Sequence, residues 1–355
     1  MELRAEVRNL REYVAIPSVN PMGRDDLPAE ICGEGRYAEH LELQLRRLGL
    51  DVEILGPAER PSVIAWAGSA RDRDTLLVAS HLDTVPVDGM EIDPFDPRIV
   101  GDRLYGRGSC DTKAGMAALV SALEAVLASG TLRRNLIVVG ESDEELGSIG
   151  ARAVIDRLRA LPRRPDWSLA TEPTELQLVH RHKGVVHARL CARGVAGHSS
   201  DPASGRNAIV QLAHAVLSLE QLASDLLERR DPSLGPATLS IGTIGGGTAP
   251  NVIPDRAELV LDRRVLPREE ADQVRAEIET RLARDGVDEV RVTACELRKA
   301  PLSTRADHPA IRQCSSALVS AGREPVLATA AFGTDAGVFE AAGIPGVVLG
   351  PGSIA

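Results

Sequence analysis

Short polar clusters that directly follow apolar runs constrain the fold of this chain more than any other feature. The run Thr75 to Ala79 leads into Ser80-His81-Leu82-Asp83, and the run Leu136 to Gly140 leads into Glu141-Ser142-Asp143-Glu144-Glu145. Apolar runs of this length, bounded by polar residues, are typical of buried strands. Open α/β sheets place their functional sites at the carboxyl ends of such strands. The pattern therefore predicts an α/β protein whose site is built from these clusters.

The composition supports this fold class and narrows the kind of partner. Of the 355 residues, 43% are hydrophobic and only 2% are aromatic, so the core must consist of Val, Leu, Ile and Ala. Such a core suits parallel strands covered by helices, and the length is enough for two domains. The net charge of -10 argues against nucleic acid and anionic membranes and favours a small-molecule partner.

The cysteines and the amino terminus indicate where the protein resides. The chain has 5 cysteines, which are unclustered and without CxxC spacing, so neither a disulfide framework nor a zinc knuckle is expected. The first residues are typical of an amphipathic helix rather than a signal peptide. We therefore expect a cytoplasmic protein.

The pattern of elements predicts a domain inserted into another. The expected elements of the first domain are helices 35–48, 113–128, 148–158 and 309–321 and strands 52–55, 62–67, 75–79, 136–140 and 346–349. From residue 179 to 291 the order changes to strand 185–192, helix 207–227, strands 238–244 and 257–261 and helix 268–284. This order predicts a small α+β domain. We expect residues 290–297 to rejoin the first sheet, so that residues 1–178 and 292–355 form one domain around the insertion.

His81, Asp83 and Asp111 are candidates for a metal site. His81 and Asp83 alternate along an extended segment, so they cannot both point at one ion without a turn and should have different roles. A neutral imidazole is a good zinc or cobalt ligand, and a nearby carboxylate can hold the other ring nitrogen. Asp111 lies in the glycine-punctuated turn before helix 113–128, where it can bridge two cations or cap the helix.

Glu144 and Glu145 are adjacent carboxylates, which are costly to bury without a metal or a proton. One can bind a metal while its neighbour takes a proton from metal-bound water. In isolation the alternative is an acidic, solvated loop, which the presence of His81 and Asp111 disfavours. Glu172 ends another short apolar run and supplies a further oxygen ligand. Such a set of His, Asp and Glu residues suits zinc, cobalt or manganese.

Together these residues resemble the M20 metallopeptidase and deacylase family, which includes acetylornithine deacetylase and succinyl-diaminopimelate desuccinylase. The resemblance implies a zinc-peptidase-like, three-layer catalytic domain with an inserted, ferredoxin-like lid or dimerisation domain at 179–291. It implies two divalent metals. His81, Asp111 and Glu172 would hold one, Asp111 and Glu145 would hold the second, Glu144 would be the general acid/base, and Asp83 would orient His81.

The resemblance also implies roles for residues farther along the chain. His198, in Gly197-His198-Ser199-Ser200, would stabilise the oxyanion across the interface of a homodimer. Asn251 and Arg264 would contact the substrate or its carboxylate, for which an arginine fork is well suited. Gly333 is assigned to substrate binding because Gly333-Thr334-Asp335-Ala336 is similar to the acetylornithine deacetylase branch. From the residues alone, a loop histidine, a turn asparagine and a salt-bridged strand arginine remain alternatives.

One departure from the family pattern concerns the second metal. In the family this metal takes a histidine shortly after the Gly350-Pro351-Gly352-Ser353 loop, whereas the chain as given stops at Ala355, so we expect an incomplete second site. The expected function is metal-dependent hydrolysis of the amide bond of N-acyl amino acids, with Glu144 as the general base for metal-activated water. The alternatives are an M20 dipeptidase or carboxypeptidase and a metal-poor, catalytically silent binding protein.

Overall fold

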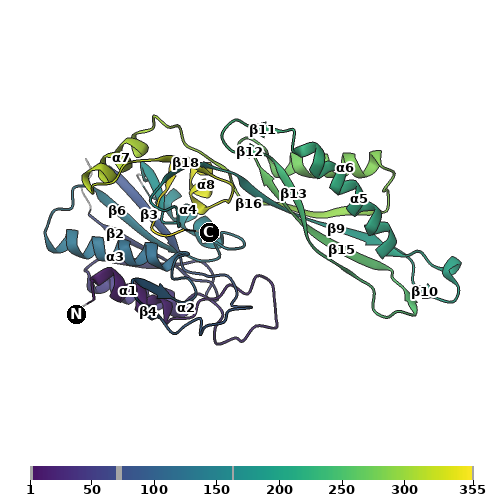
Figure 1. The fold of residues 1–355 in the computed structure, drawn as a ribbon, viewed down its shortest axis with the longest axis horizontal. Coiled ribbons are helices and arrows are strands. Elements are labelled where there is room, and N and C mark those ends of the chain that lie inside the picture. The colour runs from purple at the N-terminus through teal and green to yellow at the C-terminus, as the bar shows by residue number, and fades with distance from the viewer. Residues whose placement is uncertain (1–2, 69–73, 162–163, 354–355) are drawn as a thin grey trace. The chain divides into compact units, whose positions relative to one another are not determined.

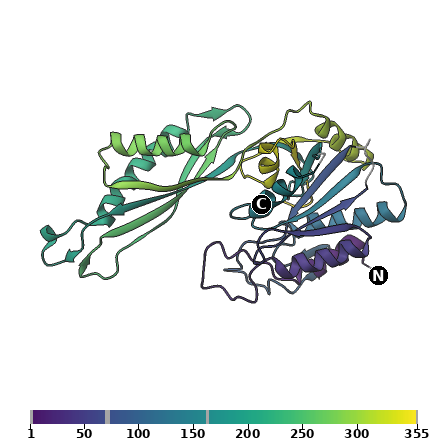
Figure 2. The same cartoon turned by 180° about the vertical axis from the view of Figure 1, so that it is seen from behind.

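A mixed sheet forms the centre of the first of two units into which the described part of the chain divides (Figures 1 and 2). The computed structural model describes residues 3–68, 74–161 and 164–353. The first unit takes in the described residues of Met1–Arg181, Leu302–Thr329 and Thr334–Ala355. Its sheet has the order β1-β2-β6-β3-β7-β19-β8-β17, and β18 pairs with β8. The strands are β1 Asp51–Leu55, β2 Ser62–Ala67, β3 Thr75–His81, β6 Asn135–Glu141, β7 Trp167–Ala170, β8 Leu178–His182, β17 Leu302–Ser303, β18 Leu327–Ala330 and β19 Gly346–Val348.

The strands that matter for the site are β6, β3 and β7, which are neighbours and run parallel. His81 pairs with Glu141, and Ala79 pairs with Ala170. The carboxyl ends of the three strands therefore lie at one edge of the sheet, where α/β proteins place their sites. The structure extends the predicted strand 75–79 to His81, so this side chain projects from the sheet itself. The α/β class predicted from the sequence is confirmed.

Helices cover both faces of this sheet and produce three layers. The helices are α1 Ala5–Val14, α2 Gly35–Arg47, α3 Lys113–Ala128, α4 Ile149–Arg159, α7 Pro309–Ser320 and α8 Asp335–Ala341. Val63 and Ile64 are consecutive in β2 and point to opposite faces. Val63 packs with Tyr13 of α1 in one core, and Ile64 packs with Phe339 of α8 in the other. The three-layer arrangement expected for the catalytic domain is therefore present.

The second unit is an antiparallel sheet with the helices α5 and α6 packed on it. It takes in His182–Pro301 and Ala330–Gly333. Its strands have the order β13-β15-β9-β16, and the chain order β-α-β-β-α-β is the ferredoxin-like one predicted for the insertion. Its elements are β9 Gly184–Arg193, α5 Ala208–Leu226, β13 Thr238–Gly246, β15 Arg256–Val265, α6 Ala271–Arg284 and β16 Val290–Lys299. Leu190, Leu219 and Ile278 join strand and helices in one core.

The expectation that residues 290–297 rejoin the first sheet is wrong. They belong to β16, which pairs with β9 from Val290 opposite Ala192 to Lys299 opposite Val185. Val290 and Val292 are buried in the core under the helices, whereas Arg291 is exposed. A strand with one apolar face suits a sheet that is covered on one side only, so β16 belongs to the second unit.

Both units also contain short two-stranded sheets. They are β4 Arg98–Val100 with β5 Arg103–Tyr105, β10 Gly197–His198 with β14 Val252–Ile253, and β11 Arg230–Asp231 with β12 Gly235–Pro236. Across the described ranges, no helix combines the length and apolar character that crossing a membrane requires. Ile354 and Ala355, on which the expectation of an incomplete second metal site rests, lie outside the described residues.

Candidate metal centre

The ends of three parallel strands and the start of one helix bring the predicted metal ligands and the predicted general base together. His81 is the last residue of β3, Glu144 and Glu145 follow β6, and Glu172 follows β7. Asp111 lies two residues before the first residue of α3. Possible ligand atoms form two groups, each with its atoms within 4.8 Å of one another. The groups are His81, Asp111 and Glu145, and His81, Glu144 and Glu172.

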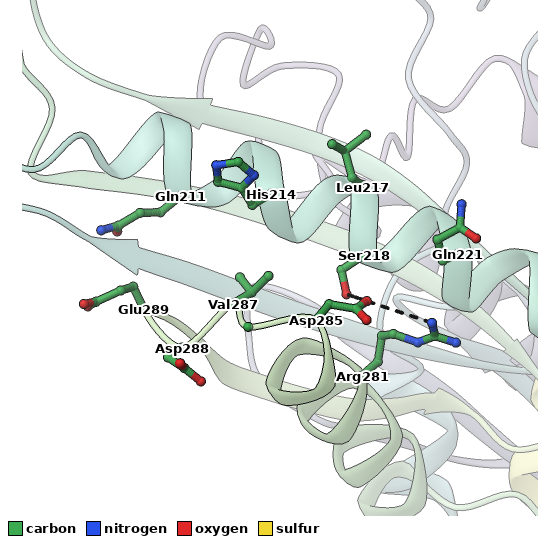
Figure 3. Close-up of a pocket in the computed structure, with 11 residues that line it drawn as sticks. Gln211, His214, Leu217, Ser218, Gln221, Arg281, Asp285, Val287, Asp288 and Glu289 are labelled. Carbon is green, nitrogen blue, oxygen red and sulfur yellow. Dashed lines mark hydrogen bonds and ion pairs between the residues drawn. The ribbon is translucent and has the colours of Figure 1, made fainter.

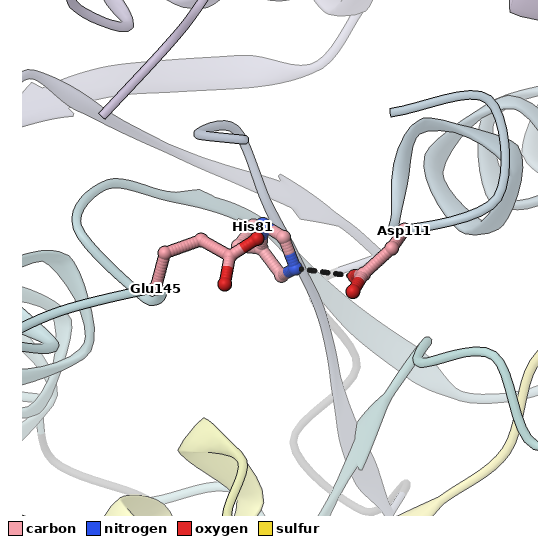
Figure 4. Close-up of side chains that lie close together, drawn as sticks. All are labelled: His81, Asp111 and Glu145. Atoms are coloured by element: carbon pink, nitrogen blue, oxygen red, sulfur yellow. Dashed lines mark hydrogen bonds and ion pairs between the residues drawn. The ribbon is translucent and has the colours of Figure 1, made fainter. Parts of the chain in front are cut away.

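Figure 4 shows His81 between Asp111 and Glu145. The division of the carboxylates differs from the one that the resemblance implied, because Glu172 falls into one group with Glu144 rather than with Asp111. His81 belongs to both groups, and its imidazole is therefore the common point of the centre.

The imidazole of His81 is held with one nitrogen turned towards the carboxylates. Its Nδ1 lies 2.9 Å from the main-chain carbonyl oxygen of Asp83. Because a carbonyl only accepts hydrogen bonds, the proton of the neutral ring is on Nδ1. The other nitrogen, Nε2, lies 3.0 Å from Asp111 Oδ1 and 3.7 Å from Glu172 Oε2. In histidines that bind metals, one ring nitrogen typically donates a hydrogen bond that fixes the ring, and the other nitrogen faces the metal.

The electrostatics of the centre fit a divalent cation. Burial alone lowers the pKa of His81, but the carboxylates of Glu172, Asp111 and Glu144 together raise it well above its ordinary value. His81, Glu144 and Glu172 are all buried, and several like charges in such a place are costly without a compensating cation. One imidazole nitrogen and several carboxylate oxygens also form the donor set that zinc, cobalt or manganese accepts.

Asp83 contacts the centre in a different way from the one expected. Its carboxylate lies 3.6 Å from His81 Nδ1, too long for a hydrogen bond, so the main-chain carbonyl of Asp83 makes the contact that orients the ring. The two carboxylate oxygens instead accept the backbone N–H groups of Glu144 and Glu145, at 3.0 and 3.1 Å. The side chain of Asp83 thus binds the loop that carries both glutamates.

His198 and Asn251 lie together in the second unit. His198 pairs with Val252, the neighbour of Asn251, and the N–H of Ser199 donates to the carbonyl of Asn251 at 3.1 Å. Both residues are exposed, and His198 Nδ1 lies 2.7 Å from the hydroxyl of Ser200. Their segment joins the sheet near Asp255, whose carbonyl accepts the N–H of Gly194 just beyond β9.

Arg264 and Gly333 lie at the opposite end of the same sheet. Arg264 pairs with Val185 at the start of β9, and its Nε donates to Asp262 at 2.8 Å. Gly333 lies beside Val185, because a Cβ on this glycine would be 3.3 Å from the Val185 side chain. The ten residues of β9 span about 30 Å. Within the second unit, His198 and Asn251 therefore lie at one end of the sheet, and Arg264 and Gly333 lie at the other.

A pocket in the second unit contains none of the predicted site residues (Figure 3). It lies between α5 and the carboxyl end of α6, and its charged lining residues include Arg281 and Asp285. Asp285 accepts a hydrogen bond from Ser218 at 2.7 Å, and Arg281 pairs with Asp225 and Asp285. These side chains pair with one another, and none of the residues that line the pocket belongs to the two groups of possible metal ligands.

Sequence reasoning missed Asn20, a fully buried residue that contacts the support of the centre. Its Nδ2 donates to Asp83 Oδ2 at 2.8 Å. Asn20 lies in an irregular segment, and the apolar residues before it, Tyr13 to Ile16, lie at the end of α1 and just beyond it rather than in a strand of the sheet. Only its position in space reveals the contact.

Comparisons with known proteins decide the family. A family model described as peptidase family M20/M25/M40 matches residues 77–355. The chain belongs to this family. As a member of the M20 family, it is a metallohydrolase that acts on amide bonds.

Relatives and solved structures of the M20 family resemble the chain over most of its length. It is 34% identical to acetylornithine deacetylase from Myxococcus xanthus, over 82% of this chain and 76% of that enzyme. It is 37% identical to acetylornithine deacetylase from Klebsiella pneumoniae, over 62% of this chain and 58% of that enzyme. The structure of an M20 family metallo-carboxypeptidase from Sulfolobus solfataricus has a TM-score of 0.79 at 21% identity, covering 98% of this chain and 91% of that one. This last likeness shows the fold.

Proposed function

We propose that this M20 hydrolase cleaves the amide bond between an acyl group and an amino acid. The observation that carries the proposal is the cluster of His81, Asp111, Glu144, Glu145 and Glu172 at the ends of parallel strands. The choice of an N-acyl amino acid is supported by the acetylornithine deacetylases, at 34% and 37% identity. Arg264 offers a guanidinium that suits the carboxylate of such a substrate.

Two divalent metals, zinc in the first place and otherwise cobalt or manganese, fit this centre. His81, Asp111, Glu145 and Glu172 would hold them, since their donor atoms converge and their charges need compensation. When bound, such ions lower the pKa of water towards about 7 and polarise a carbonyl group.

Glu144 would accept the proton of the attacking water and pass it to the leaving amine. The carboxylate of Asp83 accepts the backbone N–H groups of both adjacent glutamates and fixes the main chain of both. Their side chains nevertheless belong to different groups of possible ligands, Glu144 with Glu172 and Glu145 with Asp111, and this difference supports different roles. Glu144 is 4% exposed, so the proton is held away from bulk solvent.

The adjacent glutamates provide a matched test of these roles. Glutamine keeps the shape of glutamate but cannot take up a proton, so Glu144→Gln should lower kcat by about 10²- to 10⁴-fold and keep the metal. Glu145→Gln, one residue away, should lose metal. Both are measured by amide hydrolysis and by metal analysis of the purified protein. Normal turnover by Glu144→Gln would contradict the assignment of Glu144 as the proton acceptor.

The substrate class is tested with a panel of compounds. N-acetylornithine, N-succinyl-diaminopimelate, other N-acyl amino acids and dipeptides are compared by kcat/KM on the metal-loaded protein. Preference for N-acyl amino acids supports the proposal. Preference for dipeptides would make the chain a peptidase, and absence of both metal and turnover would leave only a binding protein.

We also propose that the enzyme works as a homodimer in which His198 stabilises the oxyanion in the partner's site. His198 is exposed and lies beyond the opposite end of β9 from Arg264, so it is accessible to another copy of the chain. Apolar side chains of the same unit are also exposed: Val210 and Leu217 of α5 at 52% and 67%, and Ile244 of the edge strand β13 at 58%. Exposed edges and apolar patches are typical of interfaces.

A further inference from the structure

The loop that carries Glu144 and Glu145 contains backbone conformations that are unfavourable unless surrounding contacts hold them. Asp143, directly before Glu144, has a φ of 63°, and Ser148 has a φ of 54°. These are left-handed conformations, which L-residues other than glycine keep only where the surroundings hold them. The N–H groups of Gly147 and Ser148 both donate to the carbonyl of Asp143 and close the loop. The position of Asp143 therefore determines where the two glutamates begin.

Arg60 and Glu34 hold Asp143 by both its main chain and its side chain. Arg60 donates to the two carboxylate oxygens of Glu34 at 2.7 and 2.6 Å, and its guanidinium lies 3.1 Å from Asp143 Oδ1. Glu34 in turn accepts the backbone N–H of Asp143 at 3.0 Å. Glu34 is 0% exposed and Asp143 is 2% exposed, so these contacts lie in the interior. Paired, charge-assisted bonds of this kind fix geometry well.

Asn20 joins Asp143 to Asp83. Its Nδ2 donates to Asp83 Oδ2 at 2.8 Å and to Asp143 Oδ1 at 3.0 Å, which uses both hydrogens of the amide. Its Oδ1 accepts the N–H of Met22 at 3.0 Å and fixes the orientation of the amide. Asn20 thus places a neutral donor between two buried carboxylates that would otherwise repel each other.

We propose that Asn20 and Arg60 are positioning residues of the metal centre. They hold Asp83 and Asp143, and through these the main chain of Glu144 and Glu145. The inference rests on the proposed function, in which these glutamates are the proton acceptor and a metal ligand. Neither Asn20 nor Arg60 belongs to the two groups of possible metal ligands, so each would act through the residues that it holds.

The test replaces each residue by its closest analogue. Asn20→Asp keeps the shape but sets a third carboxylate against Asp83 and Asp143, and Arg60→Lys keeps the charge but loses the paired bonds to Glu34. Removal of such outer partners costs about 10- to 100-fold in metal affinity or activity, so zinc affinity and kcat should each fall by about that factor. KM should change by less than about threefold, because the substrate is not contacted.

Asn9→Asp is the matched control. Asn9 is another buried asparagine of the first unit, and its side chain bonds to Ser121 at 3.0 Å and Gln44 at 3.2 Å rather than to the centre. This variant should have a lower thermal midpoint but zinc affinity and kcat within about twofold of the wild type, since it tests the same change without the positioning role.

Zinc affinity, measured by competition with a chelator, makes the outcomes separable. Unchanged affinity and unchanged kcat in folded Asn20→Asp and Arg60→Lys would overturn the proposal. If Asn20→Asp does not fold, Arg60→Lys decides, because the Arg60 side chain is 18% exposed and its charge is retained. A wild-type chain that binds zinc but cleaves no N-acyl amino acid would overturn the proposed function, and the affinities of the variants would still decide the role of Asn20 and Arg60.

Discussion

His182 shows how strongly burial alone changes one side chain. It is fully buried at the end of β8, and its Nδ1 lies 2.9 Å from the carbonyl of Lys183. Burial lowers the pKa of His182 from 6.5 to about 4, because the hydrogen bond to the carbonyl only partly offsets it. The folded protein therefore keeps this imidazole neutral at a pH where the unfolded chain protonates it.

This difference predicts loss of stability in acid. Below pH 6.5 the unfolded chain binds a proton at His182 that the folded protein does not bind until about pH 4, so the free energy of unfolding falls as the pH falls through this window. Between about pH 7.5 and about pH 4.5 the His182 contribution is about 2–3 kcal/mol, and His182→Gln should remove it. Urea unfolding of both proteins at the two pH values measures it. An equal loss in acid for variant and wild type would contradict the prediction.

The candidate residues of the centre could be predicted one by one, but their supports could not. His81, Glu144, Glu145 and Glu172 each follow an apolar run, and this position alone indicates a shared edge of a sheet. Asn20 follows the end of a helix rather than a predicted strand, so its place at the centre is not indicated. The contact of His81 with a carbonyl rather than a carboxylate is likewise invisible in a sequence, because every residue has a carbonyl.

At the level of elements, α3 packs directly on the segment that carries Glu172. A Cβ on Gly115 would lie 2.3 Å from the hydroxyl and 2.5 Å from the carbonyl oxygen of Thr171, so only glycine allows this approach. The hydroxyl of Thr112 also donates to the carbonyl of Thr171. The helix that follows Asp111 and the strand end that carries Glu172 are thereby held at a fixed separation.

Gly115→Ala should force these two elements apart. Overpacking of this kind costs about 1–3 kcal/mol, and we expect that loss in the free energy of unfolding together with lower metal affinity. Gly35→Ala, at the start of α2, is the control, because nothing lies within 4 Å of its Cβ position. That change should stay within about 1 kcal/mol of the wild type. Chemical denaturation compares the two, and equal effects would refute the role of the close approach.

Elements with clear periodicity could be predicted with accurate ends, but not always with the correct neighbours. The predicted strand 62–67 and helix 113–128 coincide with β2 and α3. Strand β16 was also expected, yet in the wrong sheet, because alternation of apolar and polar residues shows that one face is buried but not which partner buries it.

At the level of the whole molecule, the described chain enters the second unit at two places. Besides His182–Pro301, the short segment Ala330–Gly333 belongs to it. The N–H of Lys183 donates to the carbonyl of Ala330 at 3.3 Å, and Lys299 Nζ donates to that of Gly333 at 3.3 Å. No periodic pattern can develop over so few residues, so a return of this kind could not be predicted from the sequence.

The proposed dimer predicts that two inactive variants restore each other. Glu144→Gln and His198→Ala, expressed together, should recover about a quarter of wild-type hydrolysis, because half of the dimers are mixed and each mixed dimer has one complete site. Glu144→Gln with Asp111→Asn is the control and should recover nothing, since both changes damage the same subunit's centre. Light scattering measures the mass alongside the assay. A monomer, or no recovery with His198→Ala, would rule out the shared histidine.

The carboxylates of Asp111, Glu144, Glu145 and Glu172 repel one another until a cation joins them, and this couples folding of the first unit to the metal supply of its surroundings. An ion that binds only the folded arrangement stabilises it by mass action, by about 2.7 kcal/mol at 100 times its dissociation constant. When metal is scarce, the folded protein therefore loses stability as well as activity. The lifetime of the protein, and not only its turnover, becomes a measure of the free metal around it.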